Sequence, residues 1–179
     1  MNDIKDTALL LVDVQGNLAQ AMFKKDELFK NLQILIQGLN ILEIPIVWAE
    51  QMPDKLGPTL SEISEHLSGN QPISKSSFSC LKSKPLKIAI ENTHRKNWLI
   101  AGIESHICVY QSTFDFLQAG YRVEVIADGV SSRTLENKTI GLNRCQAAGA
   151  GITSTESILF ELLKDASAPA FRQIAKLVK

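Results

Sequence analysis

Short apolar runs alternate with amphipathic stretches along most of the chain. Residues 8–12 (Ala-Leu-Leu-Leu-Val) and 98–103 (Trp-Leu-Ile-Ala-Gly-Ile) are continuous apolar runs, which are typical of strands buried on both faces. Shorter runs at 46–49, 121–126 and 151–153 predict three more strands. The chain therefore contains at least five strands, separated by longer segments.

The segments between these strands carry apolar residues at helical spacing. The clearest is 26–42, where leucines and an isoleucine recur every three or four positions. Gly120 is suited to end a helix, because it tolerates the left-handed conformation that follows a last helical turn. The same pattern predicts further helices over 105–119, 135–148, 156–164 and 169–179.

Repeated strand–helix–strand units predict parallel strands joined by right-handed crossovers. We therefore expect an α/β fold, a three-layer, doubly wound, mainly parallel β-sheet with helices on both faces. A length of 179 residues suits a single domain over 1–179. In such sheets ligands bind beyond the carboxyl ends of the strands, where the winding reverses. Functional residues should then follow strands, near positions 13, 50, 103 and 127.

Residues 51–84 depart from this alternation. The segment is rich in prolines and glycines, and only a short helix over 60–67 is indicated. Long irregular segments in compact domains are usually functional loops. We expect this segment to form one wall of the binding pocket.

Composition and charge restrict the class of partner. Nineteen lysines and arginines balance nineteen aspartates and glutamates, so no net field attracts nucleic acid or an acidic membrane. No apolar run reaches the ~18 residues that cross a bilayer. The first six residues lack the pattern of a secretory signal, and three cysteines do not make a disulfide framework. These features predict a cytoplasmic protein with neither nucleic acid nor a membrane as partner.

Asp13 directly follows the first predicted strand, which puts a carboxylate at the functional edge of the sheet. A helix cap or a solvated loop aspartate explains this position equally well. Haloacid-dehalogenase chemistry needs a second acid two residues later, where Gln15 stands. A receiver domain needs a phosphoacceptor aspartate on the third strand, which is not found. Residues 13–17 also lack the glycine pattern of a dinucleotide-binding turn.

Cys108 lies where a predicted strand runs into a helix. If Ser105 is the N-cap, Cys108 falls in the first helical turn, where unpaired amides and the helix dipole favour a thiolate. The competing interpretation is a small buried apolar residue, the common role of a free cysteine. Cys80, in a polar loop, and Cys145, within a helix, lack this setting, and we assign them structural or incidental roles.

A thiol nucleophile requires a base. His106 is two residues from Cys108 in the same turn, so the two side chains should diverge, and His66 and His94 are no better placed. Asp13 emerges from a neighbouring strand at the same edge, and a buried carboxylate can accept a thiol proton. Two adjacent anions need a nearby cation. Lys75 is a candidate, although its spacing does not distinguish it from other lysines.

Three blocks of sequence resemble the isochorismatase-like hydrolases. They are Leu-Val-Asp-Val-Gln around Asp13, Lys-Ser-Ser-Phe-Ser from Lys75, and Gly-Ile-Glu-Ser-His-Ile-Cys-Val over 102–109. Their order and separation agree with that family over nearly the whole chain. The resemblance implies a catalytic triad of Asp13, Lys75 and Cys108. It also implies a cis peptide bond between Ile103 and Glu104, and an oxyanion hole formed by the backbone amides of Glu104 and Cys108.

Departures from the better-known branches refine this prediction. Residues 48–51, 128–133 and 155–163 resemble a subgroup, the isochorismatase-domain-containing proteins of undefined substrate. Isochorismatase proper lacks the cysteine. Nicotinamidases bind a metal through an Asp-x-His pair and a further histidine, where this chain offers only Asp54 and His66, so we expect no metal and no cofactor. His106 replaces a usual aspartate, and we expect it to contact substrate together with Gln51.

These residues predict a cysteine hydrolase that cleaves a small amide, ureide or carbamoyl-type C–N bond through a covalent thioester. One alternative is a non-catalytic module on the same fold that binds a small metabolite or a partner. Another is a thiol-dependent isomerase or redox protein, which the absence of a Cys-x-x-Cys motif near Cys108 disfavours.

The resemblance also implies a homodimer or a dimer-based oligomer. Two predicted helical regions carry more apolar side chains than one covering stripe requires. The alternative is that these side chains complete the monomer's own core. They are Phe114, Phe116 and Leu117 after Cys108, and Phe160, Leu162, Leu163, Phe171, Ile174 and Leu177 near the C-terminus.

Overall fold

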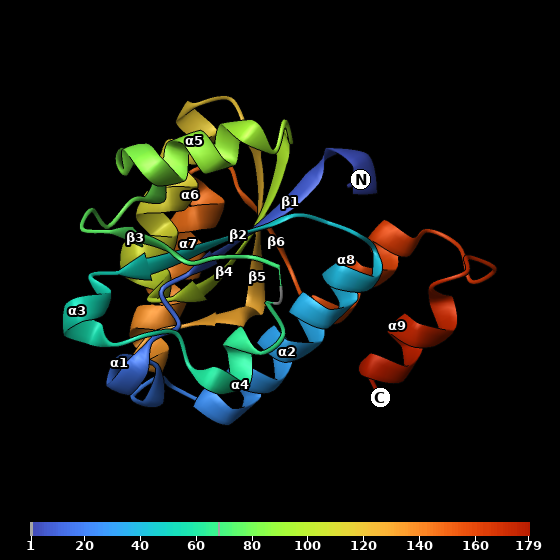
Figure 1. The fold of residues 1–179 in the computed structure, drawn as a ribbon, viewed down its shortest axis with the longest axis horizontal. Helices are drawn as coiled ribbons and strands as arrows, with labels where there is room; N and C mark the ends of the chain where they lie inside the picture. The colour runs from blue at the N-terminus through green and yellow to red at the C-terminus, as the bar shows by residue number, and fades with distance from the viewer. Residues whose placement is uncertain (1, 68) are drawn as a thin grey trace.

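A six-stranded parallel sheet forms the middle layer of the molecule (Figure 1). The computed structural model describes residues 2–67 and 69–179. The strand order is β3-β2-β1-β4-β5-β6, so the chain winds outward from β1 in both directions. The strands are β1 (Thr7–Val12), β2 (Ile46–Gln51), β3 (Ile73–Lys75), β4 (Asn97–Ile103), β5 (Arg122–Ser131) and β6 (Gly151–Thr153).

Helices cover both faces of the sheet. Figure 1 shows α5, α6 and α7 on one face and α2 and α8 on the other, with α9 packed against α2 and α8. This arrangement confirms the predicted three-layer, doubly wound α/β fold. The helices are α1 (Gly16–Gln20), α2 (Lys25–Ile41), α3 (Pro53–Leu56), α4 (Ser61–Ser64), α5 (Lys84–Asn92), α6 (Tyr110–Gln118), α7 (Leu135–Ala147), α8 (Thr155–Leu163) and α9 (Phe171–Leu177). Shorter turns are η1 (Ile4–Asp6), η2 (Cys80–Lys82) and η3 (Ser105–Val109).

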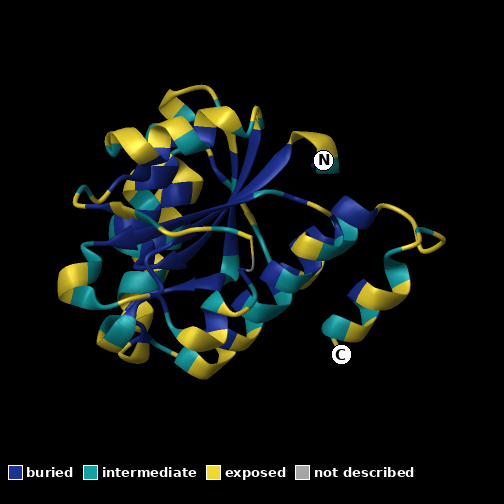
Figure 2. Ribbon diagram, in the orientation of Figure 1, coloured by how far each residue is buried: buried dark blue, intermediate teal, exposed yellow. Residues whose placement is uncertain are grey.

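The two central strands are buried along their whole length (Figure 2). Alternate residues of β1 enter different cores: Leu9 and Leu11 face α2 and α8, whereas Leu10 and Val12 join the cluster that includes Cys108. Burial on both faces explains why β1 and β4 read as continuous apolar runs. The residues that follow them therefore start from the most rigid part of the molecule.

The winding of the sheet reverses between β1 and β4. Val12 is the last paired residue of β1, opposite Ala49 on one side and Gly102 on the other. The chain then turns sharply at Asp13, whose φ is 52° and whose amide donates to Ala49 O at 3.1 Å. The peptide bond between Ile103 and Glu104, at the end of β4, is cis. The turn at Asp13 and the end of β4 therefore both lie at the switch point, where doubly wound sheets bind ligands.

The segment after β2 is more regular than we expected. Residues 51–84 contain α3 and α4, and β3 pairs with β2 so that Gln51 is opposite Lys75. A three-residue strand after Pro72 is too short to give a periodic signal, and its pairing arises only in the tertiary structure. Similarly, β5 continues to Ser131, past the predicted end at 126, because the register shifts between Ile100 and Gly102.

Four of the nine apolar residues that we assigned to an oligomer interface are buried in the chain's own core. Phe116 joins the cluster under α6, and Leu162, Leu163 and Ile174 are buried with α2. The alternative interpretation is therefore correct for these four. Phe114 differs, since it is 42% exposed on the surface of α6.

None of the helices within residues 2–67 and 69–179 has the length and apolar character needed to cross a bilayer.

Gly102 offers a test of how tightly the switch point is packed. A Cβ there would lie 2.0 Å from Val12 O, whereas a Cβ at Gly120 meets no atom within 4 Å. Both glycines have positive φ, 114° and 85°, so alanine is strained at either position. We expect Gly120→Ala to lower the free energy of unfolding by about 1 kcal/mol and Gly102→Ala by about 3 kcal/mol or more. Denaturant unfolding measures both, and equal losses would contradict close packing of β1 against β4.

Candidate active site

Asp13 and Lys75 form a buried ion pair at this edge of the sheet. Lys75 Nζ lies 2.7 Å from Asp13 Oδ2, and the two side chains are 0% and 3% exposed. Asp13 is the first residue after β1, and Lys75 is the last residue of β3, two strands away. A lysine from the outer strand thus reaches across β2 to the central strand, and water is excluded from the pair.

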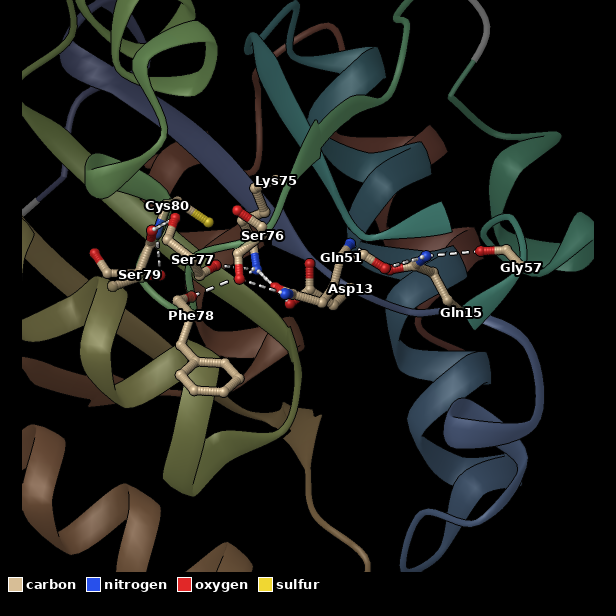
Figure 3. A network of polar contacts seen from close by, with 11 residues as sticks. Asp13, Gln15, Gln51, Gly57, Lys75, Ser76, Ser77, Phe78, Ser79 and Cys80 are labelled. Carbon is tan, nitrogen blue, oxygen red and sulfur yellow. Dashed lines mark hydrogen bonds and ion pairs between the residues drawn. The ribbon is translucent and has the colours of Figure 1, made fainter. Parts of the chain in front are cut away.

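The ammonium of Lys75 is surrounded by acceptors (Figure 3). Besides Asp13, it donates to Gln51 Oε1 at 2.6 Å and approaches the carbonyl oxygens of Ser77 at 3.2 Å and Phe78 at 3.4 Å. An ammonium has three N–H groups and accepts nothing. Lys75 is therefore held as a charged group with no donor left for a ligand.

Asp13 retains one free acceptor. Oδ2 is engaged by Lys75, whereas Oδ1 is buried and accepts no hydrogen bond from any residue that the structure describes. Burial raises the pKa of the Asp13 carboxyl, while the Lys75 charge and its hydrogen bond act to lower it. A buried carboxylate with a raised pKa and an open oxygen is suited to accept a proton.

Cys108 lies in η3, a π-helical turn that leads directly into α6. Such wide turns occur frequently at functional sites. The side chain is nearly buried, at 7% exposure for the residue, and burial raises the pKa of the thiol. The nearby Asp13 charge raises that pKa further, and Lys75 opposes both effects. Desolvation of Cys108 therefore opposes the thiolate that the helix dipole would favour.

The first residues of η3 are fixed by side-chain contacts. The Glu104 carboxylate accepts from the backbone N–H of Arg133 at 3.1 Å and from its Nε at 3.2 Å. The Glu104 carbonyl accepts from the amides of Ile107 and Val109, on either side of Cys108. Glu104 thus anchors the start of the turn, and its backbone N–H belongs to the cis peptide bond.

Ser105 does not cap this helix, contrary to our expectation. Glu104 occupies the N-cap position without a side-chain cap, and the Ser105 hydroxyl lies 2.6 Å from Ser132 Oγ. Ser132 Oγ is also 2.9 Å from Nδ1 of His106. The first turn is stabilised by contact with the loop after β5, which local sequence does not reveal. This contact orients the half-buried His106 ring beside the site.

The Gln51 side chain is held by hydrogen bonds within the protein. Its Oε1 accepts from Lys75 and its Nε2 donates to Ser76 O at 2.8 Å, so both polar atoms of the side chain are engaged within the protein. Gln15 stands where haloacid-dehalogenase chemistry would need a second acid, and we predicted no role for it. It is fully buried and contacts the backbone of Gln51. Its position two residues after Asp13 is the sequence signal for a shared site.

The remaining candidates lie outside this cluster. Cys80 and Cys145 are buried among apolar side chains, and burial raises the pKa of Cys80 to about 12. His66 Nε2 lies 3.5 Å from a Glu65 oxygen, and Asp54 is on α3. No group of three histidine, cysteine or acidic side chains within residues 2–67 and 69–179 is arranged to hold a metal ion.

Comparison with known proteins assigns the family. The isochorismatase domain matches residues 7–157, which include β1, β3 and η3. The chain belongs to the isochorismatase family. Isochorismatase family protein 1B of Dictyostelium discoideum is 36% identical over 97% of this chain and 86% of its own length. The secreted isochorismatase effector Isc1 of Phytophthora sojae is 36% identical over 97% of this chain and 84% of its own length.

Solved structures agree with this assignment. MAR1 ribonuclease from Caenorhabditis elegans is 31% identical, with a TM-score of 0.92 over 99% of this chain and 91% of that one. YcaC from Pseudomonas aeruginosa, solved with hexane-2,5-diol and covalent acrylamide, is 25% identical, with a TM-score of 0.92 over 98% and 90%. YcaC from Escherichia coli, an octameric hydrolase of unknown specificity, shares the fold at 21% identity and a TM-score of 0.93 over 98% and 88%. The family therefore includes hydrolases.

The ion pair can be tested by a double-mutant cycle on stability. Asp13→Asn leaves a buried ammonium unpaired, and Lys75→Met leaves a buried carboxyl without its cation. We expect each to lower the free energy of unfolding by about 3–5 kcal/mol. The double variant should lose less than the sum, since neither charge remains. Denaturant unfolding provides the values.

A matched control comes from the exposed pair of Lys87 and Glu91, whose closest N and O atoms are 3.9 Å apart. Lys87→Met should change stability by no more than about 0.5 kcal/mol. Additive effects of Asp13→Asn and Lys75→Met would show that the two side chains do not act as a buried pair.

Proposed function

We propose that this protein is a cysteine hydrolase that cleaves a small amide, ureide or carbamoyl-type C–N bond. The observation that carries the proposal is the Asp13 carboxyl group next to the buried thiol of Cys108, with Oδ2 held by Lys75 and Oδ1 without a hydrogen-bond partner among the described residues. A carboxylate and a thiol in this relation form a base and a nucleophile. Lys75 supplies the charge that keeps Asp13 ionised until the proton moves.

In the first half of the reaction, Asp13 accepts the Cys108 proton as the sulfur attacks the carbonyl carbon of the substrate. The carbonyl π electrons move to oxygen, and the backbone N–H groups of Glu104 and Cys108 hold the oxyanion. When the tetrahedral intermediate collapses, the C–N bond breaks and Asp13 returns the proton to the leaving amine. The product is an amine or ammonia, and the acyl group remains on sulfur as a thioester.

In the second half, Asp13 accepts a proton from water, whose oxygen attacks the thioester carbon. The C–S bond breaks, the sulfur takes the proton back from Asp13, and the acid is released. Lys75 donates to acceptors throughout and gives up no proton, because its three N–H groups remain occupied.

We expect a small substrate that is uncharged or weakly polar. Lys75 has no donor left for a substrate carboxylate. His106 is the side chain that we assign to substrate contact, because Ser132 fixes its Nδ1 and leaves Nε2 as the other polar atom of the ring. Gln51 already bonds within the protein through both polar atoms, and we assign it to holding Lys75 rather than to substrate contact.

The comparisons support a nucleophile in this fold. The covalent acrylamide described for Pseudomonas aeruginosa YcaC indicates that this relative carries a group that adds to an activated carbon–carbon double bond. The ribonuclease name of the Caenorhabditis elegans neighbour suggests RNA as a substrate. Equal numbers of acidic and basic residues do not favour a polyanion, so we keep the small molecule.

Assembly and location extend the proposal. Escherichia coli YcaC is described as octameric, and we expect a homodimer or dimer-based oligomer here as well. Phe114, exposed on the helix that follows Cys108, is the residue that such contact would cover. We also expect the cytoplasm as the location, while the Phytophthora sojae relative is named as secreted.

The direct test is a hydrolysis screen over small amides, ureides and carbamoyl compounds, with an RNA oligonucleotide included. Amine or ammonia release should occur with the wild type and with Cys80→Ala, and fall to the background of the assay with Cys108→Ala. Rapid acid quench followed by intact-mass spectrometry should detect the acyl group on Cys108. Cys80→Ala is the matched control, because it also removes a buried thiol.

Turnover that persists in Cys108→Ala would contradict a cysteine nucleophile. Cleavage of the RNA in preference to every small compound would show that the substrate is RNA and not a small amide, ureide or carbamoyl compound. Saturable binding of a small compound, without turnover and without an adduct, would favour the binding module.

A further inference from the structure

Two glutamines link the ends of three strands around the ion pair (Figure 3). Gln51 is the last residue of β2, between Asp13 after β1 and Lys75 at the end of β3. Gln51 and Lys75 are paired in register, so their side chains leave the sheet on the same face. The side-chain amide of Gln51 is therefore the uncharged acceptor next to Asp13 to which Lys75 donates.

Gln15 fixes Gln51 in turn. Its side-chain Oε1 accepts from the backbone N–H of Gln51 at 2.7 Å, and its Nε2 donates to the backbone O of Gln51 at 3.2 Å. The same Nε2 donates to Gly57 O at 2.7 Å. The Gln15 side-chain amide thus bonds the backbone at the end of β2 in the way that a paired strand residue would. It does so beyond Asp13, where β1 has turned away from β2. Gln15 is fully buried, so these bonds do not compete with water.

The contacts close into a ring. The backbone N–H of Gln15 donates to the backbone O of Asp13 at 2.8 Å, and the Gln15 side chain accepts from the backbone N–H of Gln51. The Gln51 side chain accepts from Lys75 at 2.6 Å, and Lys75 donates to the Asp13 carboxylate at 2.7 Å. The ring begins at the backbone carbonyl of Asp13 and ends, through Lys75, at the Asp13 carboxyl group that we assign as the base. Without the Gln51 oxygen, Lys75 would keep only Asp13 and two longer contacts to backbone carbonyls.

We propose that Gln51 and Gln15 are positioning residues, which hold the Lys75 ammonium on Oδ2 of Asp13 and leave Oδ1 open for the Cys108 proton. This inference rests on the proposed function, since it concerns the same base. Gln51 acts through Lys75, and Gln15 acts through Gln51. Neither side chain contacts the substrate.

The test is the pH dependence of Cys108 modification by acrylamide, followed by mass spectrometry. With Asp13 as base, the rate falls as pH drops through the pKa of Asp13, and this fall is the acid limb of the pH–rate profile. In Gln51→Met the ammonium is less firmly held against the carboxylate, so the pKa of Asp13 rises and this acid limb moves up by about one pH unit. On the acid side of the limb, the rate then falls about tenfold. The exposed Gln146→Met is the matched control and should leave the limb unchanged.

Two further variants separate positioning from general loss of structure. Gln51→Glu retains an oxygen for Lys75 but adds a second carboxylate, so the limb should move further upward than in Gln51→Met. Gln15→Met should shift the limb in the same direction. The double variant Gln15→Met/Gln51→Met should shift it no more than Gln51→Met alone, because both act through one contact.

An acid limb that stays in place in folded Gln51→Met and Gln51→Glu would overturn this inference and leave the proposed function standing. Additive shifts in the double variant would overturn the role of Gln15. A wild-type rate with no acid limb would overturn both the inference and the proposed base.

Discussion

The buried contact between Lys75 and Asp13 is the interaction on which the functional edge of this molecule depends. The two side chains come from β3 and from the turn after β1, and they are 2.7 Å apart with almost no exposure. Such a pair is costly to desolvate, and removal of either partner leaves an uncompensated charge. Its geometry must therefore be supported from outside, by Gln51 and by the carbonyls of the loop after β3.

The same ion pair influences whether the thiol of Cys108 keeps its proton. Burial makes the thiol hard to ionise, and the adjacent carboxylate makes it harder still. A stable thiolate is thus disfavoured, and the proton leaves only if Asp13 accepts it during attack. A neutral thiol beside a poised base is less open to unwanted oxidation than a resident thiolate. Within the proposed mechanism, low intrinsic reactivity and catalytic competence arise from one arrangement of charges.

Much of the fold could be predicted from the sequence, because its central strands are buried on both faces and read as apolar runs. Asp13 and Cys108 were found because each follows such a strand. Lys75 stood out by family resemblance alone, since β3 has three residues and no periodicity. The effect of burial on the pKa of Cys108 could not be predicted, because a helix terminus is visible in sequence whereas desolvation depends on tertiary packing. The links from Gln15 to Gln51 and from Ser105 to Ser132 join distant segments, so no local pattern reveals them.

The central claim is that Asp13, rather than a resident thiolate, activates Cys108. The most direct measurement is the rate of Cys108 alkylation against pH in the wild type and in folded Asp13→Asn. In the wild type, the rate should rise through the Asp13 pKa, which burial lifts above the ordinary range for aspartate, and then level off through neutral pH. Asp13→Asn should lose this plateau and react appreciably only in alkaline solution, where the thiol itself ionises. Identical profiles for the two proteins would contradict the account.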